Sequence, residues 1–296
     1  MKNLDFPLYT AMITPMNEDG SIDYESLEYL LRKQEQAKVG TLVLGSTGEG
    51  LNLTDQEKRA VVKFSKELNL DVPLMVGIGG YGVEDQKKFM IYCDQVGIDS
   101  FLLVTPLYAK PGQEGQFEWF SALMKTTTTS CFLYNVPSRT GIKLQPEVPA
   151  RLAKEFEHLV GIKEASGSVE EFRELRKHSP TLKFYSGDDG LTEAFTKEGG
   201  VGLVSVASNV WPAQTRKMIE LMLDSNFDDL YKDWKESTKA LFSASNPVPA
   251  KVLLQHKGWI TNTTVRLPLS LSDLTSEGEE DLLEADRKIN NWYKNK

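Results

Sequence analysis

Lys163 ends a short apolar run, in "LVGIKEAS" (159–166), at a position where another apolar residue would complete a β-strand. Burial disfavours the charged form of an amine, so a lysine at an apolar strand end can become nucleophilic near neutral pH. A neutral amine attacks ketones, and the Schiff base that results needs neither a metal nor a cofactor. The structural alternatives are a lysine that extends to solvent or one that pairs with Glu164.

The preceding apolar run, "CFLYN" (131–135), contains a tyrosine near its end and is followed by an arginine. Tyr134 occupies the place on its run that Lys163 has on the next, where a phenol could relay protons to and from a carbinolamine. Core packing is the structural alternative for an aromatic residue at a strand end. Arg139, in "VPSRTG", offers a planar fork suited to a carboxylate, or is a surface arginine.

Two glycine-rich segments bear on anion binding. In "GSTGEG" (45–50), Ser46 and Thr47 would present two hydroxyls and exposed backbone N–H groups to an anion, but the ending of a nucleotide phosphate loop is missing. "GIGGYG" (77–82) has the spacing of a dinucleotide-binding turn. No acidic residue ends the next run, "FLLVT", where a ribose would need one, so we expect no dinucleotide site.

The elements that must position these residues recur regularly along the chain. Short runs rich in Val, Leu, Ile and aromatic residues, without clean polar alternation, are typical of strands buried on both faces. They lie at 8–14, 41–45, 73–79, 100–105, 131–135, 159–163, 182–187 and 201–206. Helix-like segments separate them, which predicts an α/β fold, a closed (β/α)8 TIM barrel, with the chemically unusual residues at the carboxyl ends of the strands.

Helical patterns are expected at 23–38, 54–68 and 84–97, with Asp23 and Thr54 as N-caps. After Trp211 the strand pattern stops, and residues 213–224, 226–243, 247–257 and 277–294 read as helices, interrupted at "SNPVPAK" by its prolines. We predict a catalytic barrel domain over 1–225 and a C-terminal helical region over 226–296.

Composition excludes several classes of function. Acidic residues outnumber basic ones, 42 to 34, and no basic run interleaved with aromatics could follow a phosphate backbone, so nucleic acid is not an expected partner. No apolar stretch reaches the roughly 18 residues of a membrane span, and no signal peptide is expected. The only cysteines, Cys93 and Cys131, predict buried thiols in the cytoplasm. The three histidines have no ligand spacing, so neither a metal nor a cofactor is expected.

Together, "GSTGEG", "YNVPSRTG", "GIKEASG" and "SGDD" closely resemble the dihydrodipicolinate synthase family of pyruvate-dependent class I aldolases, also called 4-hydroxy-tetrahydrodipicolinate synthases. The resemblance extends from "TAMITPMNEDGSID" to "SNPVPAK". It implies that Lys163 forms an imine with pyruvate, whose enamine attacks L-aspartate 4-semialdehyde in lysine and diaminopimelate biosynthesis. It also implies that Tyr134 shuttles protons in a relay with Ser46 and Tyr108.

The resemblance assigns further residues to substrate binding. Thr47 would hold the pyruvate carboxylate, Arg139 the carboxylate of the second substrate, and main-chain groups near Gly187 and Val204 would line the pocket. The tyrosine matched by Tyr108 reaches into a neighbouring subunit's site in this family, which implies a homo-oligomer, either a dimer or a tetramer.

Two departures from the family pattern bear on the substrate and on regulation. The synthases usually have two threonines where this chain has Ser46 and Thr47, and "GSTGE" also occurs in sialic acid lyases. N-acetylneuraminate lyase, or a 2-keto-3-deoxy sugar-acid aldolase, is therefore the alternative function. Arg139 argues against it, because the hydroxyls of a sugar-acid substrate would leave the charged guanidinium without an anionic partner. Leu107 and "GLNLTDQEK" stand where lysine-inhibited members carry a tyrosine and polar residues, so we predict weak or absent inhibition by lysine.

Overall fold

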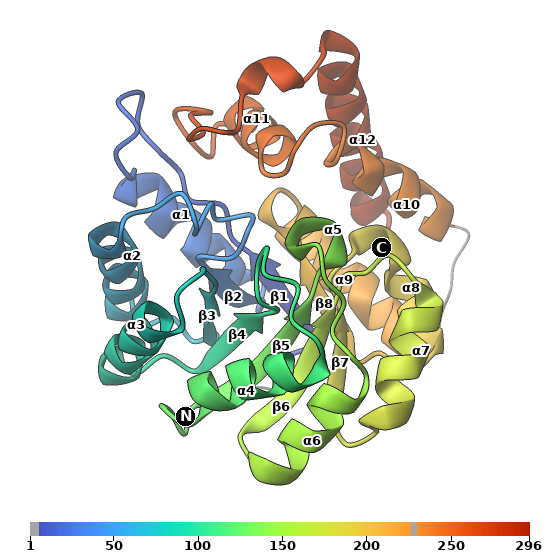
Figure 1. The fold of residues 1–296 in the computed structure, drawn as a ribbon. Helices are drawn as coiled ribbons and strands as arrows, with labels where there is room; N and C mark the ends of the chain where they lie inside the picture. Colours follow the sequence, from blue (N-terminus) through green and yellow to red (C-terminus); the bar gives the residue numbers. More distant parts are fainter. Residues whose placement is uncertain (1–5, 226–229) are drawn as a thin grey trace.

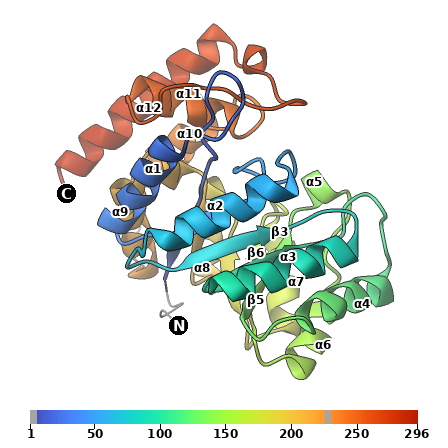
Figure 2. The ribbon, with the colours of Figure 1, turned by 90° about the vertical axis from the view of Figure 1, so that its left-hand side faces the viewer.

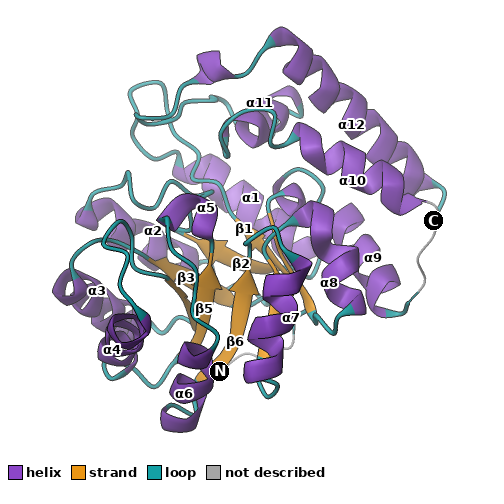
Figure 3. Ribbon diagram, turned by 45° about the vertical axis from the view of Figure 1, so that its right-hand side comes forward, coloured by secondary structure: helices purple, strands orange, loops and turns teal. Residues whose placement is uncertain are grey.

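Eight parallel strands form a closed barrel. Figures 1 and 3 show the strands surrounded by helices. The computed structural model describes residues 6–225 and 230–296. β8 pairs with β1 and closes the ring, which confirms the predicted (β/α)8 barrel and the position of every strand in it. The strands are β1 (Leu8–Ala11), β2 (Gly40–Val43), β3 (Leu74–Ile78), β4 (Ser100–Val104), β5 (Ser130–Asn135), β6 (Leu159–Glu164), β7 (Lys183–Ser186) and β8 (Gly202–Ser205).

Helices follow the strands and cover the outside of the barrel (Figure 3). They are α1 (Tyr24–Gln36), α2 (Asp55–Glu67), α3 (Val83–Val96), α4 (Gln113–Met124), α5 (Pro137–Thr140), α6 (Glu147–Glu155), α7 (Val169–His178), α8 (Thr192–Lys197) and α9 (Pro212–Leu223). Both predicted N-caps are confirmed. Asp23 accepts the Ser26 N–H at 3.0 Å, and Thr54 forms a reciprocal capping box with Glu57.

The C-terminal helices α10 (Leu230–Ala240), α11 (Val248–His256) and α12 (Ser276–Lys294) pack together beside α1 and α9 (Figures 1 and 2). They confirm the predicted helical appendage. The predicted domain boundary at 226 lies outside the described residues, so it stays a prediction. None of the helices in the described ranges is long and apolar enough to cross a membrane.

Two apolar clusters reflect the two faces of the strands. The larger one fills the space between the sheet and the surrounding helices. The smaller one fills the barrel interior, since its members alternate along the strands with those of the outer layer. It consists of Tyr9, Ala11, Leu42, Met75, Leu102, Phe132, Tyr134, Val136, Tyr185 and Val204. Side chains at the carboxyl ends of the strands therefore point either into this interior or toward the surrounding helices.

Candidate active site

Lys163 and Tyr134 lie side by side at the carboxyl ends of β6 and β5. They are register partners, and the Lys163 Nζ stands 4.3 Å from the centroid of the Tyr134 ring. Laterally paired residues of parallel strands face the same side of the sheet, and Tyr134 and the other register partner, Tyr185, belong to the interior cluster. Lys163 thus points into the barrel with its side chain 5% exposed. The geometry supports an amine placed next to a phenol in an apolar enclosure.

Glu164 does not pair with Lys163. It is the next residue of the strand, so its side chain faces outward, and its carboxylate accepts from the Asn135 amide at 2.7 Å and from the Ser166 N–H at 2.6 Å. Burial raises the pKa of Glu164, while these hydrogen bonds oppose the shift. The alternative in which Glu164 neutralises Lys163 is therefore wrong, and so is the alternative of a lysine that extends to solvent.

Gly187 leaves room for the lysine. A Cβ atom at this position would stand 2.9 Å from the Lys163 Cε and 2.7 Å from the Ala165 Cβ, so any larger residue would push against the amine's stem. Val204, on β8, is buried in the interior cluster. Both residues lie at the same end of the barrel as Lys163, while their predicted role in lining the substrate pocket stays a prediction.

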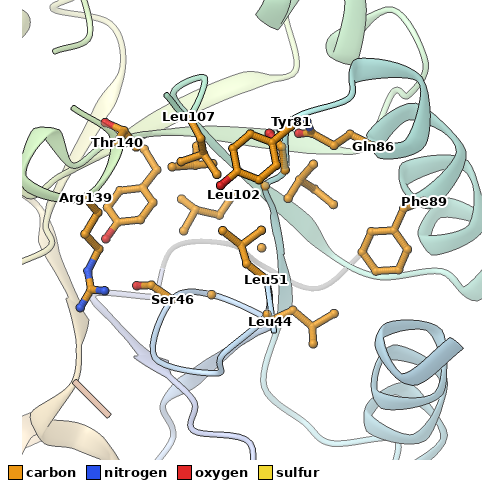
Figure 4. Close-up of a pocket in the computed structure, with 18 of the residues that line it drawn as sticks. Leu44, Ser46, Leu51, Tyr81, Gln86, Phe89, Leu102, Leu107, Arg139 and Thr140 are labelled. Atoms are coloured by element: carbon orange, nitrogen blue, oxygen red, sulfur yellow. Dashed lines mark hydrogen bonds between the residues drawn. The ribbon is translucent and has the colours of Figure 1, made fainter. Parts of the chain in front are cut away.

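One large cleft, of about 1430 Å³, joins four of the predicted residues. Ser46, Tyr108, Tyr134 and Arg139 line it, and in Figure 4 the Arg139 guanidinium points toward the loop that carries Ser46. No hydrogen bond links the hydroxyls of Ser46, Tyr108 and Tyr134 within the described ranges. The structure therefore brings the members of the predicted relay to one cleft, while their connection stays a prediction.

Arg139 sits on the short helix α5, directly after β5, and is exposed. The turn is held by Thr140, whose hydroxyl donates to the Ile142 carbonyl at 2.9 Å, and by Gly141, which has the left-handed φ of 73°. Within residues 6–225 and 230–296, Arg139 makes no ion pair. Its five donors are available to an anion in the cleft.

Tyr108 stands at the rim of the cleft with 87% of its surface exposed and a left-handed φ of 67°. Such a φ is uncommon for a bulky residue. The backbone N–H of Tyr108 donates to the Thr140 carbonyl at 3.4 Å, which ties this loop to the one that carries Arg139.

Thr47 is buried, with 2% of its surface exposed, and it is not among the residues that line the cleft. Its hydroxyl accepts the Asn246 amide N–H at 2.9 Å. Two residues further, Glu49 forms an ion pair of 2.6 Å with Lys251, and both side chains are fully buried. These contacts join the loop after β2 to the C-terminal region. The sequence motifs did not predict these contacts, although "SNPVPAK" contains both partners.

A second buried carboxyl, Asp189, follows β7. It accepts the Ser205 hydroxyl at 2.5 Å and the N–H groups of Val206 at 2.9 Å and Ala207 at 3.3 Å, all at the end of β8. Burial raises the pKa of Asp189 to about 6, and these hydrogen bonds oppose the shift. Asp189 thus joins the loops after β7 and β8, which carry Gly187 and follow Val204. No group of three or more His, Cys, Asp or Glu side chains in the described ranges is arranged to hold a metal ion.

Comparison with known proteins agrees with this geometry. Residues 7–285 match the model of the dihydrodipicolinate synthetase family. The chain belongs to this family. It is 45% identical to the 4-hydroxy-tetrahydrodipicolinate synthase of Francisella tularensis subsp. novicida (strain U112) over 97% of this chain and 96% of that protein. The predicted family, and with it an enzyme of the aldolase-type lyase class, is confirmed.

Solved structures of the dihydrodipicolinate synthase family have the same fold. The enzyme from Aquifex aeolicus superposes with a TM-score of 0.91 at 30% identity, covering 96% of this chain and 98% of that one. The enzyme from Cyanidioschyzon merolae with lysine bound gives 0.91 at 32% identity, covering 98% and 99%. Family membership therefore extends over the barrel and the C-terminal helices together.

Proposed function

We propose that this protein is a 4-hydroxy-tetrahydrodipicolinate synthase that condenses pyruvate with L-aspartate 4-semialdehyde through a Schiff base on Lys163. The observation that carries the proposal is the buried amine of Lys163, which stands 4.3 Å from the ring centroid of Tyr134, a residue that lines the cleft together with Ser46 and Arg139. The enzyme would serve lysine and diaminopimelate biosynthesis.

The chemistry proceeds by covalent catalysis. The Lys163 amine attacks the pyruvate carbonyl carbon, and the carbinolamine loses water to give an imine. Loss of a methyl proton yields an enamine, which forms a carbon–carbon bond with the aldehyde. The amino group of the second substrate then attacks the imine carbon, which closes the ring and releases the lysine amine. Tyr134, with Ser46 and Tyr108, supplies and accepts the protons of these steps.

The two carboxylates are assigned to different parts of the site. Thr47 holds the pyruvate carboxylate near Lys163, with main-chain groups of Gly187 and Val204 around the keto acid. Arg139 binds the carboxylate of the semialdehyde, because its exposed guanidinium lines the cleft without an ion pair in the described ranges. A sugar-acid substrate would offer hydroxyls there, which is the reason for preferring the synthase to N-acetylneuraminate lyase or a sugar-acid aldolase.

The assembly we propose is a homo-oligomer, a dimer or a tetramer, in which Tyr108 enters the partner's site. Supporting this, three large apolar or aromatic side chains at this cleft are exposed: Leu51 by 53%, Tyr81 by 76% and Tyr108 by 87%. Covering them in a second copy would remove an apolar patch from water. We also propose a reducing, cytoplasmic location, in keeping with the free, buried thiols of Cys93 and Cys131. Burial raises the pKa of Cys93 to about 12.

Borohydride trapping tests the covalent step. Incubation with pyruvate and borohydride should add one reduced pyruvate to the chain, and peptide mapping should place it on Lys163. Lys251 is an internal control, since it is also buried but forms an ion pair with Glu49. An unchanged mass, or a label on Lys251, would overturn the Schiff-base proposal. A Lys163→Ala variant should take up no label.

Substrate choice needs a second assay. The enzyme should condense pyruvate with aspartate semialdehyde faster than it cleaves N-acetylneuraminate, and Arg139→Ala should raise KM for the semialdehyde while leaving pyruvate trapping unchanged. Faster cleavage of the sugar acid would assign the protein to the lyases. Sedimentation analysis would measure the oligomer, and a monomer at assay concentration would contradict the shared site.

A further inference from the structure

The hydrogen bond between Thr47 and Asn246 joins residues 199 positions apart in the chain. Asn246 lies between α10 and α11, in the C-terminal region, and only 6% of its surface is exposed. Its Nδ2 donates to the Thr47 Oγ1 at 2.9 Å. A residue of the appendage therefore contacts the side chain that the proposed function assigns to the pyruvate carboxylate.

The direction of this bond matters for an anionic substrate. A threonine hydroxyl has one hydrogen to donate and two lone pairs that accept. Because the Asn246 amide occupies a lone pair, the hydroxyl hydrogen is left for another acceptor, and an ionised carboxylate is an acceptor only. An acceptor at position 246 would instead take the hydroxyl hydrogen for itself.

The carbonyl oxygen of the Asn246 side chain argues against a purely structural role for this residue. Asn246 Oδ1 is buried and accepts no hydrogen bond within residues 6–225 and 230–296. A buried acceptor without a partner is costly, and such groups in native proteins are rare. The Asn246 side chain thus keeps its Nδ2 hydrogen bond to Thr47, although its Oδ1 has no hydrogen-bond donor in the described ranges.

The surrounding contacts make the position of Thr47 rigid. Gly48, its neighbour, is packed so closely that a Cβ atom would meet the Met12 carbonyl oxygen at 2.9 Å. Glu49 has a left-handed φ of 52° and carries the buried ion pair with Lys251, five residues after Asn246. The loop is thus fixed from both sides, and the amide meets the hydroxyl in one defined geometry.

We propose that Asn246 is a positioning residue for keto-acid binding: by donating its amide to the Thr47 hydroxyl, it commits the hydroxyl hydrogen to the carboxylate of the substrate. The inference rests on the proposed function, because it concerns how the Schiff-base substrate is held. It adds the C-terminal region to the substrate site, through a residue that does not touch the reacting atoms.

Trapping with pyruvate alone gives a direct measure, since the concentration at half-maximal labelling of Lys163 reports binding without the second substrate. Asn246→Ala should raise it about fivefold to tenfold, the value of one hydrogen bond. Asn246→Asp, nearly isosteric, should raise it further at pH 8, because a carboxylate takes the hydroxyl hydrogen and repels the substrate. The ratio of the half-saturating pyruvate concentration of Asn246→Asp to that of wild type should fall as the pH is lowered, because the protonated carboxyl can donate to the Thr47 hydroxyl.

A double-mutant cycle shows whether the effect passes through the hydroxyl. Thr47→Val should raise half-saturation, and adding Asn246→Ala to it should cause no further increase. Gln214→Ala is the matched control, because it removes another amide hydrogen bond to the C-terminal region, 2.8 Å to Asn290, away from this loop. That variant should label like wild type.

The outcomes separate the two proposals. Wild-type protein that takes up no label overturns the proposed function and the positioning role with it. Wild type that labels normally, with Asn246→Ala at the same half-saturation or with additive effects in the double variant, overturns the positioning role alone. If Asn246→Ala does not fold, Asn246→Asp decides, and a pH-independent ratio to wild type would contradict the inference.

Discussion

Replacing Lys251 by methionine tests the buried link between the C-terminal region and the loop after β2. The Lys251 amine makes two contacts of 2.6 Å, to the Glu49 carboxylate and to the Thr264 carbonyl, and both charged side chains are fully buried. Burial lowers the pKa of Lys251, and the charge of Glu49 opposes the shift. Methionine keeps most of the volume but leaves Glu49 with the Arg266 N–H, 2.9 Å away, as its hydrogen-bond donor.

The Lys251→Met substitution should lower the free energy of unfolding substantially, because the Glu49 carboxylate stays in the interior without its cationic partner. Breaking such a pair costs about 3–5 kcal/mol. With about 2.1 cal/mol/K of unfolding entropy per residue, a chain of 296 residues has an unfolding entropy of roughly 620 cal/mol/K, so Tm should fall by about 5–8 °C. Calorimetry at pH 7.5 measures this decrease in Tm directly.

Two further variants make the test decisive. Lys63→Met breaks an exposed pair with Glu67, 64% exposed on both sides, and should lower Tm by less than about 2 °C. Glu49→Gln combined with Lys251→Met removes both charges and should melt above the single Lys251 variant. A Lys251→Met protein that melts within about 1 °C of wild type, or a double variant less stable than the single one, would refute the reasoning.

The remaining predictions concern catalysis, pH and regulation. Tyr134→Phe should lower kcat by about 100-fold or more in the condensation assay with little change in Tm, because the lost group relays protons; activity within threefold of wild type would remove that role. Asp189 has a raised pKa, about 6, so its stability contribution is present at low pH and lost as the pH rises through 6. Between pH 7 and pH 5, wild type should therefore gain about 1.4 kcal/mol over Asp189→Asn in thermal unfolding, and equal slopes would contradict this. Lysine should inhibit weakly or not at all in steady-state assays, since Leu107 stands where lysine-inhibited members of the family carry a tyrosine; sub-millimolar inhibition would disprove it.

The barrel and the central pair of residues could be predicted because they follow from short-range patterns. Eight apolar runs at regular spacing imply a closed parallel sheet, and consecutive strands of such a sheet are neighbours. Lys163 and Tyr134 end consecutive runs, so their proximity follows from strand order alone. The interior direction of Lys163, and the outward direction of Glu164, also follow from alternation once one of the two is placed.

The contacts of the C-terminal region could not be predicted in this way. Asn246 and Lys251 reach the loop after β2 across 199 and 202 residues, and no periodicity relates a loop to a helix of a separate layer. Glu49 lies in the glycine-rich motif "GSTGEG", where the hydroxyls of Ser46 and Thr47 were the candidate ligands. Nothing in the local sequence indicates that Glu49 is fully buried. The exposure of Tyr108 depends on a left-handed backbone that a tyrosine rarely adopts, so propensity gave no indication of it.

The link between Glu49 and Lys251 also has a consequence for the order of synthesis. The ribosome releases all eight strands once Ser205 has emerged, yet the partner of Glu49 follows 202 residues after it. Until then the carboxylate must stay hydrated, and the loop that carries Thr47 cannot close against its final neighbours. The nascent barrel can therefore form its sheet before the loop after β2 reaches its final contacts.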